Sequence, residues 1–215
     1  MRNVLLLTLA LALAAAGTTM ATGSKHEVGG TAAVGNLQPF NATAAAMRFQ
    51  CMWLQPEINE QGTLARVEFK FQAYVGTAPG TFEGCKMILC HTAKTTLTNN
   101  FKTNYDFKTP VEVFSGNFTV PAGLKKNDWF TVATPSNFTY NNRNNLLMEI
   151  SWTKATGASG KFWISSAAQP GRLRAYNATA ATGRLLAGQG EVARITFGNP
   201  AVSATSLGKV KALLN

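Results

Sequence analysis

The chain has 215 residues, of which 46% are hydrophobic and only 14% are charged, a composition that excludes general disorder. Lysine and arginine number 20 against 10 acidic residues, giving a net charge of +10. Such an excess draws a protein toward a polysaccharide or another extracellular polyanion. A solvated basic surface explains it equally well, because the longest basic run is only Lys125-Lys126. The sequence has no motif for specific nucleic-acid recognition and no metal-ligand spacing.

Residues 1–21 have the three-part form of a secretory signal peptide. Arg2 precedes the apolar stretch Val4–Ala16, and small residues follow up to Ala21. The apolar stretch is shorter than the ~20 residues of a spanning helix, so cleavage after Ala21 is favoured over retention as a membrane anchor. We therefore expect a secreted or cell-surface protein with no transmembrane segment after signal cleavage.

The next segment, residues 22–46, is rich in glycine, alanine, threonine and asparagine and has no sustained periodicity, which predicts a flexible N-terminal arm. From residue 47 to residue 200 the dominant period is two. In Leu64–Val75, for example, apolar residues alternate with polar ones, which is typical of a strand with one buried face. The predicted strands are Met47–Leu54, Leu64–Val75, Cys85–His91, Val111–Val120, Trp129–Ala133, Leu146–Trp152, Lys161–Ser165, Arg172–Tyr176 and Val192–Phe197.

Clusters of turn-forming residues separate these strands, and no convincing helix lies between them. The pattern predicts an all-β fold: an antiparallel β-sandwich, jelly-roll-like, forming a single domain over residues 47–200. Residues 201–215 are predicted to be a C-terminal tail, either frayed or containing a short amphipathic helix. The turn clusters are Thr77–Gly80, Pro121–Gly123, Asn141–Asn145, Thr156–Gly160 and Ala187–Gly190.

Three cysteines are compatible with one disulfide in an oxidising compartment. Cys85 and Cys90 lie on one predicted strand, about 16 Å apart when extended and facing opposite ways, so they cannot pair with each other. A disulfide would therefore join Cys51 to Cys85 or Cys90. Three buried free thiols are the equally weighted alternative.

Candidate catalytic groups are sparse. His91 follows Cys90, but neighbours on a strand point to opposite faces, which argues against a thiol–imidazole pair. Glu57 and Glu60 are the only close pair of carboxylates, and they fall in a predicted loop. We therefore expect a protein that is not an enzyme and needs no cofactor or metal.

Outward-facing aromatic and basic residues are the better candidates for a binding site. The alternation places Trp163 opposite Phe162, and it places Arg172, Arg174 and Tyr176 opposite Leu173. If the two strands are neighbours, Trp163, Arg172, Arg174 and Tyr176 form a surface on which a sugar ring stacks and an acidic group is paired. The alternative is that Trp163 packs beneath a loop or within the core.

Most of the chain after residue 47 also resembles a family of uncharacterised secreted bacterial β-sandwich domains found in surface and adhesin-like proteins. The resemblance implies a sandwich fold and a surface role, and it carries over no catalytic residue. The family's C-terminal sorting or anchoring module is not recognisable here. The matching segments are Arg48–Gln50, Glu57-Ile58, Leu89–Thr92, Thr96-Leu97, Phe101, Pro110–Gly116, Phe118–Pro121, Phe138–Asn141, Asn144–Ile150, Arg172–Tyr176, Thr182-Gly183 and Ala193–Phe197.

Taken together, the sequence predicts a non-enzymatic extracellular binding or adhesion module, with acidic glycan as the expected ligand. The alternative is a structural subunit of an extracellular fibre or coat that self-assembles through its N-terminal arm, because open sheet edges accept an added strand. A hydrolase with dispersed catalytic residues is the least favoured of the three.

Overall fold

The structure, a computed structural model, describes residues 23–198. The predicted signal peptide, 1–21, and the predicted C-terminal tail, 201–215, lie outside the described residues.

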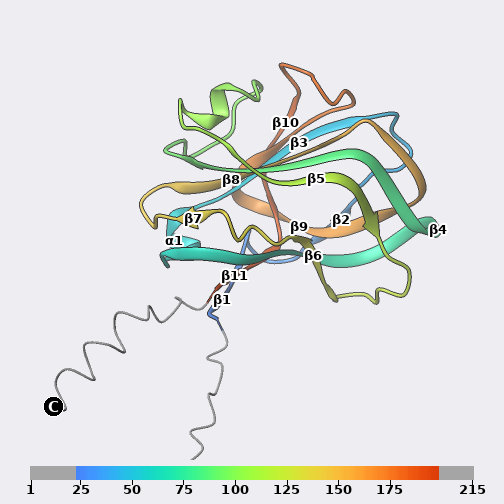
Figure 1. Ribbon diagram of the computed structural model, residues 1–215, viewed down its shortest axis with the longest axis horizontal. Coiled ribbons are helices and arrows are strands. Elements are labelled where there is room, and N and C mark those ends of the chain that lie inside the picture. Colours follow the sequence, from blue (N-terminus) through green and yellow to red (C-terminus); the bar gives the residue numbers. More distant parts are fainter. Residues whose placement is uncertain (1–22, 199–215) are drawn as a thin grey trace, which may run out of the picture.

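The described chain is almost entirely β-structure (Figure 1). Its two helical elements are single turns, α1 (Gln55–Ile58) and η1 (Thr103–Tyr105). Within residues 23–198, no helix is long and apolar enough to cross a lipid bilayer. The strands are β1 (Lys25–Val28), β2 (Val34–Asn36), β3 (Met47–Trp53), β4 (Gly62–Thr92), β5 (Val111–Val120), β6 (Trp129–Ala133), β7 (Thr139–Tyr140), β8 (Asn145–Trp152), β9 (Lys154–Ala175), β10 (Arg184–Glu191) and β11 (Ala193–Phe197).

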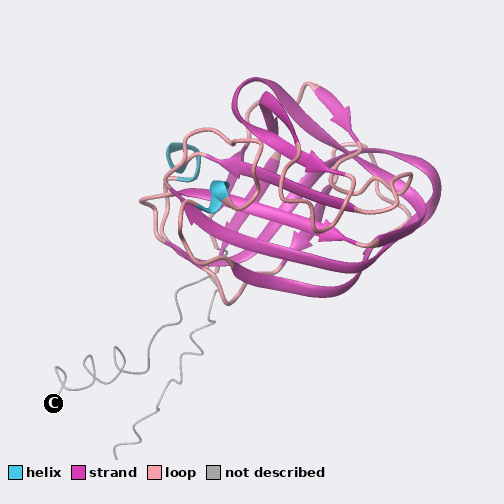
Figure 2. Cartoon of the chain, turned by 90° about the horizontal axis from the view of Figure 1, so that it is seen from above, coloured by secondary structure: helices cyan, strands magenta, loops and turns pink. Residues whose placement is uncertain are grey.

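The all-β antiparallel prediction is confirmed, but the sheet closes on itself where a sandwich was expected. The strand order is β1-β11-β4-β8-β3-β9-β10, and an additional β4–β9 pairing closes six of the strands into a barrel (Figure 2). Two pairs of predicted strands turn out to be halves of one element. Leu64–Val75 and Cys85–His91 both belong to β4, and Lys161–Ser165 and Arg172–Tyr176 largely form the second half of β9.

The predicted turns Thr77–Gly80 and Thr156–Gly160 are not chain reversals. They lie opposite each other in the β4–β9 ladder, where the register shifts. A Cβ on Gly80 would lie 1.9 Å from the carbonyl oxygen of Ala158, and Gly157 has a φ of +78°. Glycine therefore permits a close backbone approach and a bend in both strands, so these residues form a corner of the barrel.

The segment predicted to be a flexible arm is part of the sheet in its described portion, residues 23–46. Strand β1 pairs with β11, and β2 pairs with β9. Phe40 is fully buried and packs against four other phenylalanine rings, at centroid distances of 4.8 to 6.4 Å: Phe82, Phe118, Phe130 and Phe162. The carbonyl of Pro39 accepts a 2.9 Å hydrogen bond from the indole Nε1 of Trp152. The composition predicted flexibility because the segment has few large apolar residues, whereas strand pairing and the buried Phe40 ring hold its described part in place.

We predict that Phe40→Ala lowers the free energy of unfolding by about 3–5 kcal/mol, because it removes a ring from the middle of the core and leaves a cavity. Denaturant unfolding followed by circular dichroism measures the loss. Val34→Ala is the matched control on the same segment, since Val34 is 53% exposed and its loss should cost less than about 0.5 kcal/mol. Equal, small effects of both substitutions would mean that the arm is not part of the folded core.

All three cysteines are buried free thiols, so the possible disulfide is not formed. In the ladder, Met148 of β8 lies between Cys51 of β3 and Leu89 of β4. Two strand spacings separate Cys51 from β4 by about 10 Å, beyond the ~7 Å that a disulfide allows. Cys85 lies inside the barrel and Cys90 in a separate outer cluster, which agrees with their predicted opposite directions.

We predict that none of the thiols reacts with iodoacetamide in the native protein at pH 8, and that all three react after denaturation. Burial raises the pKa of the Cys90 thiol to about 11 and that of Cys85 to about 12, so the reactive thiolate is scarce at this pH as well as shielded. Intact mass spectrometry without reductant counts the modified thiols. A single reactive thiol after denaturation would indicate a disulfide.

Candidate functional site

The four residues predicted to form a binding surface do not lie on one surface. Arg172 is fully buried inside the barrel, where its Nη1 donates to Oε2 of Glu191 at 3.1 Å and its Nη2 donates to Oε1 of Gln189 at 2.7 Å. Burial raises the pKa of Glu191 to about 7, against the opposing effect of the Arg172 charge. Arg172 therefore belongs to the buried interior and offers no contact to a ligand outside.

The other three residues are divided between the two ends of one ladder. Trp163 and Arg174 lie on the same strand, β9, rather than on neighbouring strands. Strand β10 runs alongside β9 and pairs with Ile164, next to Trp163, at one end of the ladder and with Arg174 at the other end. The Arg174 guanidinium carbon lies 5.3 Å from the ring centroid of Tyr176, whose side chain is 54% exposed. The assumption that two adjacent strands bring these side chains together is therefore wrong.

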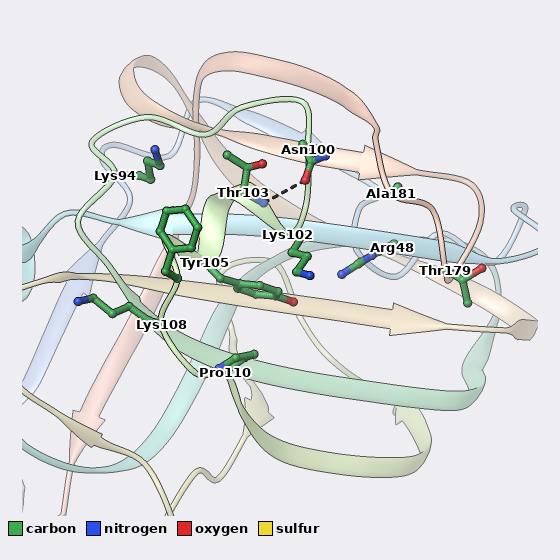
Figure 3. A pocket seen from close by; sticks show the side chains of 11 residues that line it. Arg48, Lys94, Asn100, Lys102, Thr103, Tyr105, Lys108, Pro110, Thr179 and Ala181 are labelled. Carbon is green, nitrogen blue, oxygen red and sulfur yellow. Dashed lines mark hydrogen bonds between the residues drawn. The ribbon is translucent and has the colours of Figure 1, made fainter.

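A cleft of about 900 Å³ lies elsewhere, under the loop between β4 and β5 (Figure 3). This loop, residues 93–110, contains η1 and supplies most of the wall. Strand β3 contributes Arg48 to the floor, and the segment that follows β9 contributes the far side. The lining residues are Arg48, Lys94, Asn100, Lys102, Thr103, Tyr105, Phe107, Lys108, Pro110, Thr179 and Ala181.

Positive charge dominates the ionisable groups that line the cleft. In Figure 3, Lys94 and Lys108 lie on one side of Tyr105, and Lys102 and Arg48 lie on the other. The Lys94 Nζ is 3.9 Å from Oδ1 of Asp106. Lys102 and Lys108 are exposed and make no ion pair with any residue of 23–198. These two ammonium groups are the charges that an acidic ligand would meet unpaired.

The floor of the cleft is a fixed ionic network centred on Glu149 of β8. Its carboxylate accepts hydrogen bonds from Nε and Nη2 of Arg48 at 2.9 and 3.1 Å, from Nε2 of Gln50 at 2.7 Å and from the Tyr105 hydroxyl at 2.7 Å. The Arg48 Nη1 donates to the carbonyl of Ala180 at 2.8 Å, so this guanidinium spans the cleft floor. Glu149 and Arg48 thus hold the cleft together, and neither is free to act on a ligand.

The pKa shifts in this network favour a structural role. Burial lowers the pKa of Arg48, but its hydrogen bonds with Glu149 and the charge of that carboxylate outweigh the effect and raise it overall. Burial and the neighbouring Glu149 carboxylate raise the pKa of the Tyr105 hydroxyl. Both groups stay protonated at neutral pH, so neither supplies a general base.

Asn104 fixes the loop on the barrel. Its side chain is fully buried, and Nδ2 donates to Oε1 of Gln50 at 2.9 Å. Its Oδ1 accepts from the amide and the hydroxyl of Thr98 at 2.8 and 2.9 Å, and its carbonyl accepts from the Thr92 hydroxyl at 2.9 Å. These bonds satisfy polar groups of a loop whose only regular element is the single turn η1. The cleft therefore has a preformed wall.

Aromatic side chains supply the apolar part of the wall. Tyr105 is partly buried above the network, whereas the Phe107 side chain is fully exposed and its residue adopts a φ of 60°. An exposed phenylalanine in a left-handed conformation is uncommon, and such positions gather at functional sites. The sequence carried a weak signal for this wall, Phe101–Pro110, in which lysines and aromatic residues alternate with turn formers.

The remaining candidates have structural partners. His91 Nε2 accepts from the amide of Asn141 at 3.2 Å, and its ring stacks on Phe138 at 4.8 Å. Glu57 caps α1 by accepting from the amide of Leu54 at 3.1 Å. Glu60 binds the His26 ring nitrogen at 2.6 Å and the Ser24 hydroxyl. Within the described chain, no group of three histidine, cysteine or acidic residues is placed to hold a metal ion.

No protein-family model, no curated protein and no solved structure matches the chain. The family resemblance therefore stays a prediction, and the function rests on the geometry of the cleft.

We predict that Glu149→Gln lowers the free energy of unfolding by roughly 3 kcal/mol, because it leaves the largely buried Arg48 without its counter-ion. Loosening of loop 93–110 should accompany the loss, seen as faster hydrogen exchange at the amides of Thr98 and Asn104. Glu83→Gln is the matched control. Its ion pair with Lys154 has the same 2.9 Å distance but is exposed, so its removal should cost less than about 1 kcal/mol. Equal effects of the two substitutions would contradict a supporting role for the network.

Proposed function

We propose that this protein is a non-enzymatic extracellular binding module and that its cleft binds an acidic glycan. The observation that carries the proposal is the presence of two unpaired lysines, Lys102 and Lys108, beside aromatic side chains in a preformed cleft.

The charge of the cleft favours an anion. Glu149 already neutralises Arg48, and Asp106 lies near Lys94. Lys102 and Lys108 therefore contribute charge that only solvent or a ligand compensates. An ammonium group is a compact point charge with three rotatable donors, which suits carboxylates and sulfates in several orientations.

The remaining wall favours a sugar over a simple inorganic ion. Tyr105 and Phe107 offer aromatic faces on which the apolar face of a sugar ring stacks. The side chains of Asn100, Thr103 and Thr179 line the same cleft and offer hydrogen-bond partners to hydroxyl groups. Mostly apolar walls with a few placed polar groups are typical of ligand sites.

Binding is favoured over hydrolysis because the carboxylate in the floor is fully engaged. Glu149 accepts hydrogen bonds from three side chains, Arg48, Gln50 and Tyr105, so its oxygens are occupied within the protein and do not face a glycosidic oxygen. A binding module is also favoured over a fibre subunit. The reason is that strands β1 and β2 of the segment expected to drive assembly already pair with β11 and β9 of their own chain.

We predict that Lys102→Ala/Lys108→Ala weakens binding of polygalacturonate by roughly tenfold, the equivalent of about 1.4 kcal/mol shared by two exposed lysine contacts. Isothermal titration calorimetry at low salt measures the affinity, which should also fall as salt rises because exposed charges are screened. Lys25→Ala/Lys154→Ala is the control, since it removes the same charge from exposed lysines that do not line the cleft. Equal weakening by both variants, or equal binding of neutral dextran, would refute the proposal.

A further inference from the structure

A second surface combines aromatic rings with unpaired positive charge. It lies on the outer side of the barrel, where β4, β6, β9 and β11 run past one another, and we call it the two-tryptophan face. It comprises Trp129, Trp163, Lys70, Lys126, Asn127 and Arg194. None of these residues lines the cleft. In Figure 1, β6 and β11 lie at the bottom of the molecule, and the green loop with the helical turn lies at the top.

Two cations lie over the Trp129 ring. The Lys70 Nζ lies 5.4 Å from its ring centroid, and the Arg194 guanidinium carbon lies 4.8 Å from it. Arg194 is itself fixed by Glu68, whose carboxylate accepts from Nε at 2.7 Å and from Nη2 at 2.9 Å. The Arg194–Glu68 pair therefore anchors the ring, while Lys70 makes no ion pair with any residue of 23–198.

Trp163 has a similar environment on the neighbouring part of the face. Its indole Nε1 donates to Oδ1 of Asn127 at 3.0 Å, which fixes the ring orientation. The Lys126 Nζ lies 5.5 Å from the ring centroid, and this lysine also makes no ion pair within residues 23–198. Each partly exposed tryptophan thus has an ammonium group without an ion-pair partner over its ring.

Backbone pairing sets the spacing of the strands that carry the two tryptophans. The amide of Val192 donates to the carbonyl of Trp163 at 3.1 Å, and the amide of Lys70 donates to the carbonyl of Val192 at 3.2 Å. Lys70 in turn pairs with Trp129 in the β4–β6 ladder. Phe71 and Phe162 also pair directly, so two to three strand spacings of about 4.8 Å, roughly 10–14 Å, separate the backbones of the two tryptophans. Two tryptophans on strands at this spacing suit contact with successive units of an extended ligand.

We propose that the two-tryptophan face binds an extended acidic polysaccharide, so that the protein has a second glycan surface besides the cleft. In a uronic acid the carboxylate is attached directly to the sugar ring, so one residue brings a stacking face and a charge together. That arrangement matches a tryptophan with an ammonium group about 5 Å from its ring. In a nucleotide the phosphate is separated from the stacking base by the sugar, which fits this pairing less well.

Tryptophan fluorescence tests the proposal selectively. The chain has four tryptophans, of which Trp53 and Trp152 are fully buried and the other two lie on this face. The cleft contains none. Saturating polygalacturonate should therefore shield the accessible fluorescence from iodide quenching, and it should still do so in the cleft variant Lys102→Ala/Lys108→Ala. Failure of the cleft proposal is thus distinguishable from failure of this one.

The matched variants separate specific contact from bulk charge. Lys70→Gln/Lys126→Gln should reduce the affinity measured by iodide protection at least fivefold, and Lys25→Gln/Lys154→Gln should leave it within twofold of the original protein. Both remove two charges from side chains outside the core. No protection by polygalacturonate, equal loss in both variants, or equal protection by a single-stranded oligonucleotide at the same charge concentration would overturn the proposal.

Discussion

The pairing of β4 with β9 is the constraint on which the rest of the structure depends. Both strands continue past a corner at which Gly80 and Gly157 allow the backbones to approach, and this continuity lets six strands close into a barrel. Closure leaves the inward side chains no exit to solvent, which is why a cluster of phenylalanines and a fully buried Arg172–Glu191 pair coexist inside. A larger side chain at either glycine would strain the corner before it affected any contact in the core.

The inward-facing residues of the strands fill the interior. The outward-facing residues that alternate with them support the cleft, on β3 and β8, and form most of the two-tryptophan face, on β4, β6, β9 and β11. Arg48, Gln50 and Glu149 face outward between buried neighbours and hold loop 93–110, while Lys70 and Trp129 face outward elsewhere on the barrel. The loop contributes charge and aromatic rings, and the barrel contributes rigidity. A cleft supported in this way loses little conformational entropy when a ligand binds, which favours affinity from few contacts.

Alternation in the sequence predicts which residues share a face, but not which face is inside. The strands Val111–Val120 and Trp129–Ala133 were predicted with their observed bounds, and Val67 and Phe69 are buried as expected. Around Arg172 the same reasoning assigned the wrong side chains to the barrel interior, because it placed Leu173 inward and Arg172 outward. Leu173 packs in the outer cluster beneath loop 93–110, so its charged neighbour points into the barrel. The cleft was missed for a related reason, because hydrogen bonds from Asn104 rather than any periodic pattern order its loop.

The two proposed surfaces suggest how a protein with a net charge of +10 would select one class of polyanion. An exposed lysine contributes little on its own and is screened by salt, so two lysines in a cleft give only weak binding to a monomeric ligand. A polymer that repeats the same acidic unit presents the next unit at high effective concentration once the first is bound. Because Trp129 and Trp163 lie on strands of one sheet, two to three strand spacings apart, a chain that reaches both would gain from this effect without rearrangement of the strands. On this proposal selectivity would come from the repeat of the ligand, whereas the general basic charge would contribute mainly to the rate of encounter.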